Sequence, residues 1–327
     1  MASNGNKNVV GAPGSPLAVS AALLPIAFLL GACALEPGIS EPPPTADIAV
    51  TLTPMREFGG GASAPLTATG ERQQLGYAAA VAATSGFVFV IDSSVSALVQ
   101  LDFASGDSRR LQTLDDANTS GMYVTTDLII YVVDRFNRAV LELSESGWER
   151  RVYSDNKLIP APVDVTETNW GATILIADGL TQRLAMFDTL SNPTGLFTTT
   201  LSPVAIAASI SAIAATDDFV FVLDAASREV TQLDLYGRVV GTYGEDSLLA
   251  PVALAVDECR RMFVADGHPD GLFVSSPDFY SMESRAAVPR EIAPAVTDLW
   301  IDGNDLYVAA GTFGVHVLAI DPPCMAP

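Results

Sequence analysis

The chain is poor in positive charge and in the residues that most often carry chemistry. Its 327 residues include 17 lysines and arginines against 38 aspartates and glutamates, with two histidines and three cysteines. The formal net charge at pH 7 is −21. A surface of this sign repels the phosphates of nucleic acids and the head groups of anionic lipids. We therefore expect no nucleic-acid partner and no membrane attachment through surface charge.

The N-terminal region lacks an apolar run long enough to cross a membrane comfortably. Residues 16–30 form an apolar run of 15 residues interrupted by Pro25, whereas a spanning helix needs about 20. A polar stretch whose only cation is Lys7 precedes the run, and small residues follow it. This order is typical of a secretory signal that is removed on export.

The residues that end this run, Leu30-Gly31-Ala32-Cys33, resemble the lipobox of bacterial lipoproteins. The resemblance implies a signal peptide of residues 1–32, cleavage before Cys33, and acylation of the Cys33 thiol and the new amino terminus. The lipid on Cys33 would attach the protein to a membrane. Ala34 rather than aspartate after the cysteine is compatible with sorting to the outer membrane. We therefore expect a lipid-anchored protein of a bacterial cell envelope, in either the periplasmic or the surface leaflet.

Residues 33–47 follow the expected cleavage site and contain four prolines without hydrophobic periodicity. This composition predicts an extended tether. Removal of residues 1–32 leaves 16 basic and 38 acidic side chains, a net charge of −22. The remaining chain is therefore a strongly acidic domain on a tether.

Several motifs of known chemistry are missing from the sequence. It contains no G-x-S-x-G, H-E-x-x-H, G-x-x-x-x-G-K-[ST] or C-x-x-C-H pattern. These patterns mark hydrolase nucleophiles, zinc sites, phosphate-binding loops and covalent haem, respectively. We therefore assign no catalytic residue, no metal ligand and no cofactor.

Beyond residue 47 the sequence repeats itself six times. Each repeat contains an apolar strand, and a second apolar strand ends 10 residues after the first one ends. The first strands end at positions 92, 134, 178, 224, 266 and 311. A period near 44 residues with several short strands per unit is typical of a β-propeller blade. The pattern predicts an all-β, six-bladed propeller over residues 48–327, with four antiparallel strands per blade.

The last repeat ends at Asp321 without an outer strand, which would leave the ring with unpaired edges. Residues 48–58 alternate like a strand and have no other place in the scheme, so we expect them to close the ring. The scheme also places Cys259 and Cys324 on the same face of neighbouring blades. Export to an oxidising compartment favours a disulfide between them; two free thiols are the alternative.

The turn Asp134-Arg135-Phe136-Asn137-Arg138 and the inner strand Pro251 to Asp257 resemble NHL repeats, a family of six-bladed propellers that serve as binding platforms. The resemblance covers residues 76–321 as architecture and implies a binding role. Arg135, Phe136 and Arg138 are candidate partner-binding residues, because arginines beside an aromatic ring are typical of contacts between proteins. The alternative is that they brace their own blade.

A further candidate contact residue is His268, which lies between Asp266 and Asp270 in a glycine-flanked turn. It could contact a partner or ligate a metal; the alternative is an ordinary exposed turn residue. The recurring aspartates at the strand ends could suggest a ring of metal ligands. We expect them instead to accept backbone N–H bonds in the turns that follow.

The inner strands indicate what the central axis contains. Residues 78–84, 210–216 and 251–257 are mostly alanine and valine, which predicts an axis filled by small apolar side chains. Trp148, Trp170 and Trp300 are expected to pack in or between blades. Together these features predict a non-enzymatic, membrane-anchored envelope lipoprotein whose propeller is a protein-binding scaffold. The alternative is a metal-dependent hydrolase or lyase in the central channel, which requires several convergent carboxylate, Asn or His side chains.

Overall fold

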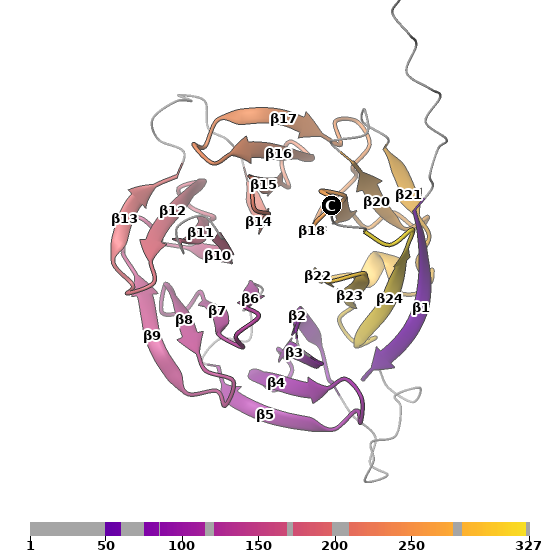
Figure 1. Ribbon diagram of the computed structural model, residues 1–327, viewed down its shortest axis with the longest axis horizontal. Coiled ribbons are helices and arrows are strands. Elements are labelled where there is room, and N and C mark those ends of the chain that lie inside the picture. The colour runs from indigo at the N-terminus through magenta and orange to yellow at the C-terminus, as the bar shows by residue number, and fades with distance from the viewer. Residues whose placement is uncertain are drawn as a thin grey trace, which may run out of the picture. The chain divides into compact units, whose positions relative to one another are not determined.

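The computed structural model contains six four-stranded antiparallel sheets, arranged as blades around a common axis (Figure 1). It describes residues 50–59, 75–84, 86–114, 121–168, 173–197, 209–276 and 283–324, all within one compact unit, Ala46–Pro327. The predicted signal peptide, Cys33 and the tether lie outside the described residues. Among the residues that are described, none forms a helix long and apolar enough to cross a membrane.

The first five blades are each one stretch of chain whose strands follow one another outward from the axis (Figure 1). Blade 1 comprises β2 (Ala78–Thr84), β3 (Phe87–Asp92), β4 (Ala97–Asp102) and β5 (Ser108–Thr113). Blade 2 comprises β6 (Met122–Val124), β7 (Ile130–Asp134), β8 (Ala139–Leu143) and β9 (Glu149–Ser154). Blade 3 comprises β10 (Pro162–Thr168), β11 (Thr173–Asp178), β12 (Arg183–Asp188) and β13 (Pro193–Leu196). Blade 4 comprises β14 (Ile210–Ala215), β15 (Phe219–Asp224), β16 (Glu229–Asp234) and β17 (Val239–Tyr243). Blade 5 comprises β18 (Ala253–Val256), β19 (Met262–Ala265), β20 (Leu272–Ser275) and β21 (Ser284–Ala286).

Blade 6 combines both ends of the propeller. A short 3₁₀ turn (Ala293–Ala295) leads into β22 (Asp298–Asp302), β23 (Asp305–Ala309) and β24 (Val315–Asp321), and β1 (Thr51–Phe58) is the fourth strand. β1 pairs antiparallel with β24 from Thr51 opposite Asp321 to Phe58 opposite Val315. The prediction that the N-terminal segment closes the ring is confirmed, and the strand begins three residues later than expected.

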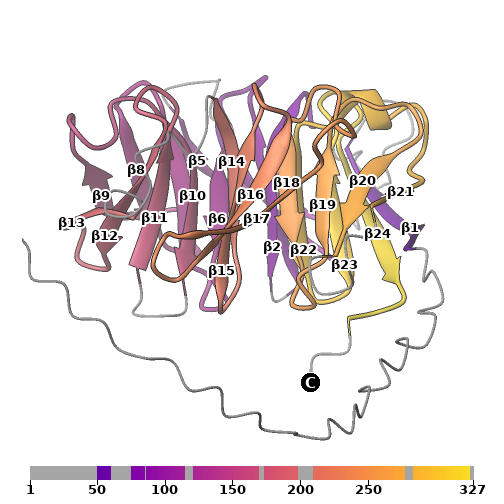
Figure 2. The same ribbon diagram turned by 90° about the horizontal axis from the view of Figure 1, so that it is seen from above.

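The strands run between two faces of the ring (Figure 2). Face A carries the turns between the second and third strands of each blade, together with the links from one blade to the next. Face B carries the turns between the first and second strands and between the third and fourth. Because neighbouring strands are antiparallel, equivalent turns of all six blades lie on the same face.

The core consists of six apolar clusters, one between each pair of neighbouring blades. Between blades 2 and 3, for example, Tyr153 packs edge-on against both Tyr131 and Phe187, with ring centroids 5.9 Å apart in each pair. Alternation along each second strand places apolar side chains on both faces of the blade, so every blade contributes to two clusters. The ring is therefore stabilised by contacts between blades, and the strand that closes it completes the cluster between blades 6 and 1.

Cys259 and Cys324 form a disulfide, with Cα atoms 5.7 Å apart and a sequence separation of 65. Cys259 lies in the turn between β18 and β19, and Cys324 follows β24. Arg261 donates from Nη1 to the Pro322 carbonyl at 2.6 Å, and the Cys324 amide donates to Asn304 Oδ1 at 2.6 Å. The disulfide and the Arg261 bond fasten the segment after β24 to blade 5, and the Asn304 bond fastens it to the turn between β22 and β23 of blade 6.

Candidate functional site

The turns of face A are held by buried aspartates at the ends of the second strands. Asp92 accepts N–H bonds from Ser94 in its own turn at 3.0 Å and from Gly76 and Tyr77 in the preceding link at 2.9 and 3.1 Å. The corresponding aspartates of blades 2–5 also accept backbone N–H bonds: Asp134, Asp178, Asp224 and Asp266. The prediction of N–H acceptors is confirmed. Each carboxylate fixes its turn, so side chains on these turns stand on a rigid base.

The turn of blade 2 presents the candidate contact residues to solvent. Asp134 accepts from the Asn137 amide and from Asn137 Nδ2, both at 2.8 Å, which explains the Asp-x-x-Asn spacing. Phe136 is 72% exposed, and Arg135 and Arg138 are also exposed. Neither arginine forms an ion pair with another described residue. The turn is therefore rigid, while its large side chains contribute little to packing within the blade.

Further exposed apolar side chains share face A with Phe136. Together with Phe136 itself, they lie in turns or links of blades 1, 2, 3, 5 and 6: Tyr77, Val95, Phe136, Leu180, Leu249, Val252 and Phe313. Face B has three in its described turns: Trp148, Leu190 and Tyr236. Exposed apolar groups that recur on one face are typical of interaction surfaces.

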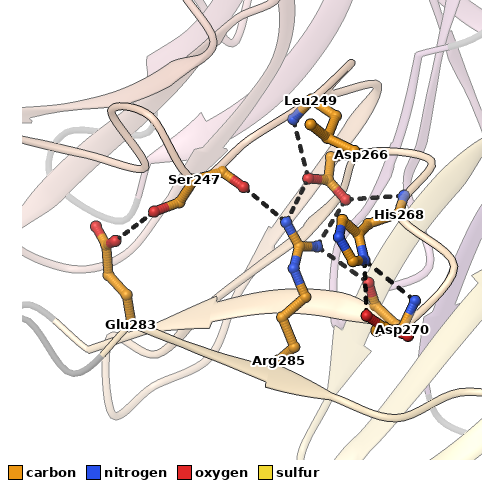
Figure 3. Close-up of polar contacts among 8 residues, drawn as sticks. Ser247, Leu249, Asp266, His268, Asp270, Glu283 and Arg285 are labelled. Carbon is orange, nitrogen blue, oxygen red and sulfur yellow. Dashed lines mark hydrogen bonds and ion pairs between the residues drawn. The ribbon is translucent and has the colours of Figure 1, made fainter.

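His268 belongs to a network in blade 5 that holds its turn (Figure 3). Asp266 is buried and forms a two-pronged ion pair with Arg285, at 2.8 Å from Nη1 and 2.7 Å from Nη2. Arg285 also donates to the Ser247 and Gly271 carbonyls. Burial alone would raise the pKa of Asp266, but the Arg285 hydrogen bonds and charge outweigh it and hold that pKa below its usual value.

The imidazole of His268 takes part in the same turn. Its Nδ1 accepts from the Asp270 amide at 3.1 Å and lies 3.6 Å from Asp270 Oδ2 (Figure 3). His268 is in blade 5 and Arg135 is in blade 2, and these blades lie opposite each other in a ring of six (Figure 1). The structure therefore places all four candidates on face A but does not bring His268 together with Arg135, Phe136 and Arg138.

The tryptophans differ from the expectation of packing. Trp300 conforms: its Nε1 donates to the Ala83 carbonyl at 2.8 Å, which links the inner strands of blades 6 and 1. Trp148 does not, because it is 77% exposed in the turn between β8 and β9 on face B. Trp170 lies outside the described residues.

The central channel contains a cavity of about 280 Å³. Inner strands of all six blades line it, largely with alanine, valine, threonine and leucine. Five acidic residues also line it. Asp257, Glu258 and Asp302 lie where the inner strands of blades 5 and 6 end on face B, whereas Asp164 on β10 of blade 3 and Asp298 on β22 of blade 6 lie within their strands. The prediction of an axis filled by small apolar side chains is therefore wrong, because it rested on the inner strands of blades 1, 4 and 5 alone.

Asp164 and Asp298 are held in the same way on opposite sides of the ring. Asp164 accepts from its neighbour Val165 at 2.8 Å and from the Ile213 amide in blade 4 at 2.7 Å. Asp298 accepts from its neighbour Leu299 at 2.9 Å and from the Val81 amide in blade 1 at 2.9 Å. Each aspartate thus joins its inner strand to that of the following blade.

Burial governs the ionisation of this pair. Burial raises the pKa of Asp164 to about 7, and its two N–H bonds limit that rise. Burial also raises the pKa of Asp298 well above its usual value, and the charge that Asp164 gains on ionisation raises it further. Because the two carboxyl groups interact, they lose their protons in two coupled steps, both at higher pH than an ordinary aspartate would.

The sequence carried a signal for these two residues. Each aspartate stands inside an apolar inner strand, in PVDVTET and AVTDLWID. Aspartate is depleted in strand interiors, so its presence at such a position indicates a specific role. Among the described residues, one group of three has potential metal-ligand atoms within 4.8 Å of one another, namely Asp257, which also lines the cavity, with Cys259 and Cys324. Both sulfur atoms of that group are joined in the disulfide, and Asp257 pairs with Arg261 at 2.6 Å.

The chain folds as a six-bladed β-propeller, and several solved structures resemble this fold. Virginiamycin B lyase from Staphylococcus aureus matches with 12% identity and a TM-score of 0.54, covering 85% of this chain and 83% of its own. A protein of unknown function from Bacteroides thetaiotaomicron matches with 14% identity and a TM-score of 0.64, covering 84% and 76%. A chain of a nidogen/laminin complex matches with 13% identity and a TM-score of 0.55, covering 72% and 92%. At these identities the likeness shows the fold alone.

Sequence comparisons do not narrow this class further. No family model matches the chain, and neither does any curated protein. Function has therefore to be argued from the surfaces and groups of this chain.

Proposed function

We propose that this protein is a non-enzymatic lipoprotein of the bacterial cell envelope, anchored through acylated Cys33, whose propeller binds another envelope protein on face A. The observation that carries the binding role is Phe136, 72% exposed between two exposed arginines on a turn fixed by Asp134. A rigid turn that presents an aromatic ring and arginines loses little side-chain entropy on binding, and these residue types dominate protein interfaces.

The anchoring part of the proposal rests on the sequence. The lipobox-like Leu30-Gly31-Ala32-Cys33 is followed by the proline-rich residues 33–47, and the compact unit begins near their end, at Ala46. Because the domain is strongly acidic, a lipid on Cys33 is the means by which it would be held at a membrane.

Intact mass and fractionation test the anchor. The membrane-extracted protein should have the mass of a chain that starts at Cys33 and carries acyl groups. A Cys33→Ser variant should remain unacylated and uncleaved at this position. A wild-type protein with an intact N-terminus would overturn the lipoprotein assignment while leaving the propeller unaffected.

Site-specific photocrosslinking tests the binding face. A photoreactive residue at position 136 on face A is compared with one at position 148 on face B, since Phe136 and Trp148 are similarly exposed, at 72% and 77%. We expect position 136 to give a defined adduct with one envelope protein, identified by mass spectrometry, that is lost when Arg135 and Arg138 are changed to alanine. The same adducts from both positions would contradict a binding face.

A second candidate function, a metal-dependent hydrolase or lyase in the channel, is favoured by one observation. Asp164 and Asp298 line the same cavity, and carboxylates are the ligands that hard divalent cations prefer. The decisive measurement is whether Mn²⁺ stabilises the protein through these two carboxyl groups.

A further inference from the structure

Face A carries a group of exposed cations over blades 2–4, which we call the basic sector. Its members come from the turn after β7, the link between β9 and β10, the start of β12 and the turn after β15: Arg135, Arg138, Lys157, Arg183 and Arg228. Three successive blades contribute to it, and Arg138 and Arg228 stand at equivalent last positions of their turns, with φ of 55° and 60°. The basic sector is therefore built from the repeat and is larger than the single turn of blade 2.

This gathering runs against the composition of the chain. Acidic side chains outnumber basic ones by 38 to 17, yet four exposed cations lie in the described turns and links of these three blades and a fifth, Arg183, begins β12. The strand-end aspartates there, Asp134, Asp178 and Asp224, are buried and directed at backbone N–H groups. The turns after β7 and β15 consequently present positive charge to solvent. The acidic side chains nearby are the half-buried Asp155 and Glu229 and, in the link after blade 4, the exposed Glu245 and Asp246.

The cations of the basic sector form no ion pairs with other described residues. Several arginines elsewhere in the propeller are paired: Arg151 with Glu142, Arg261 with Asp257 and Arg285 with Asp266. Arg110 and Arg290 form no ion pair with a described residue either, but each lies outside the basic sector. Cations left available on an acidic protein raise the local concentration of an anionic ligand and orient it.

Exposed apolar side chains stand among these cations. Phe136 lies between Arg135 and Arg138, and the exposed Leu180 precedes Arg183 by three residues. A complementary ligand must therefore combine negative charges with apolar groups. Polysaccharides and nucleic acids supply the charges without flexible apolar side chains, and an anionic bilayer would also face the net charge of −21 on the whole chain.

Extending the proposed function, on which this inference rests, we propose that the basic sector docks an acidic segment of a partner protein that carries apolar side chains. Its carboxylates pair with the arginines and Lys157, and its apolar side chains cover Phe136 and Leu180. Arginine forms two-pronged bonds with carboxylates, which adds register to charge attraction.

The test begins with an unbiased probe. A phage-displayed library of random short peptides is selected against the purified full-length protein. We expect enrichment of peptides that combine several Asp or Glu with aromatic or aliphatic residues. The best peptide is then synthesised, and its affinity is measured by fluorescence anisotropy.

Charge-reversal variants assign the binding to the basic sector. Each of three charge reversals should lower the affinity for the peptide by roughly tenfold, because each turns an attraction into a repulsion: Lys157→Glu, Arg183→Glu and Arg228→Glu. Arg110→Glu on β5 and Arg290→Glu in the link after β21 are matched controls, with exposed arginines and the same change of charge. Both controls should leave the affinity unchanged. Raising the salt concentration should weaken peptide binding by the wild type, but not by a variant that carries all three reversals.

The possible outcomes distinguish failure of this inference from failure of the proposed function on which it rests. Selected peptides that are not acidic, and that require Phe136 but tolerate all three reversals, would overturn the inference and leave the binding face standing. Peptides insensitive to Phe136→Ala and to the reversals would overturn both. Equal, reversal-sensitive binding of dextran sulfate, which lacks apolar side chains, would assign the sector to polyanions and overturn the protein partner.

Discussion

Replacing Phe58 by alanine is expected to lower the free energy of unfolding by about 4 kcal/mol, the usual cost of deleting a buried phenyl ring. Phe58 ends the closing strand β1 and is 0% exposed. It packs in the cluster between blades 6 and 1, with its ring centroid 6.0 Å from that of Phe103. The substitution removes apolar contact at the junction where the two ends of the propeller meet, and it leaves a cavity there.

Met55→Ala is the matched control, since Met55 lies on the same strand and is 54% exposed. It should change the free energy of unfolding by less than about 0.5 kcal/mol. Denaturant titration followed by circular dichroism measures both variants. Similar small losses for the two would mean that β1 only covers an edge and does not hold the ring closed.

The repeat made the architecture predictable from sequence. Each second strand, such as FVFVID at 87–92, is buried on both faces and is therefore largely apolar, and in blades 1–5 an aspartate that the following turn requires stands at its end. Six copies of this pattern determine six blades, and the missing outer strand of blade 6 leaves residues 48–58 as its replacement. The position of Cys259 and Cys324 on one face followed from the same geometry.

The candidate site was less predictable, because it depends on residues outside the repeat pattern. Asp164 and Asp298 occupy single positions in two inner strands and come together only when opposite blades face one axis. Lys157, Arg183 and Arg228 are scattered over about 70 residues, and an exposed cation looks the same in sequence whether or not an ion pair neutralises it. Trp148 shows the converse: its residue type predicts packing, but a turn on face B exposes it.

The channel carboxyl groups give the second large expected effect, a loss of stability as the pH rises through neutrality. Burial raises the pKa of Asp164 from 3.8 to about 7 in the folded protein. Between these two values the folded state holds a proton that the unfolded state has released, so unfolding becomes easier as the pH increases. A shift of about 3 units corresponds to about 4 kcal/mol of stability, present at pH 4 and lost by pH 8. The raised pKa of Asp298 acts in the same direction.

Unfolding titrations at a series of pH values measure this effect. Asp164→Asn should flatten the dependence between pH 4 and 8, because the variant has no proton to lose at that position. It should also lower the pKa of Asp298, since the charge that opposes ionisation of Asp298 is gone. Asp107→Asn, at an exposed turn residue on face B, is the control and should keep the wild-type profile. An unchanged profile in Asp164→Asn would show that other groups set the dependence.

Repeating the wild-type titration with Mn²⁺ separates the two candidate roles of the channel. A cation that binds the folded state alone stabilises it by mass action, and carboxylates bind it in the ionised form. If the pair holds a metal, stability should rise with pH when Mn²⁺ is present, and this gain should vanish in both Asp164→Asn and Asp298→Asn. If the pair instead joins neighbouring inner strands through the Ile213 and Val81 amides, Mn²⁺ should leave the falling profile unchanged. We expect the second result, because each of the four carboxyl oxygens already accepts an N–H bond from the backbone.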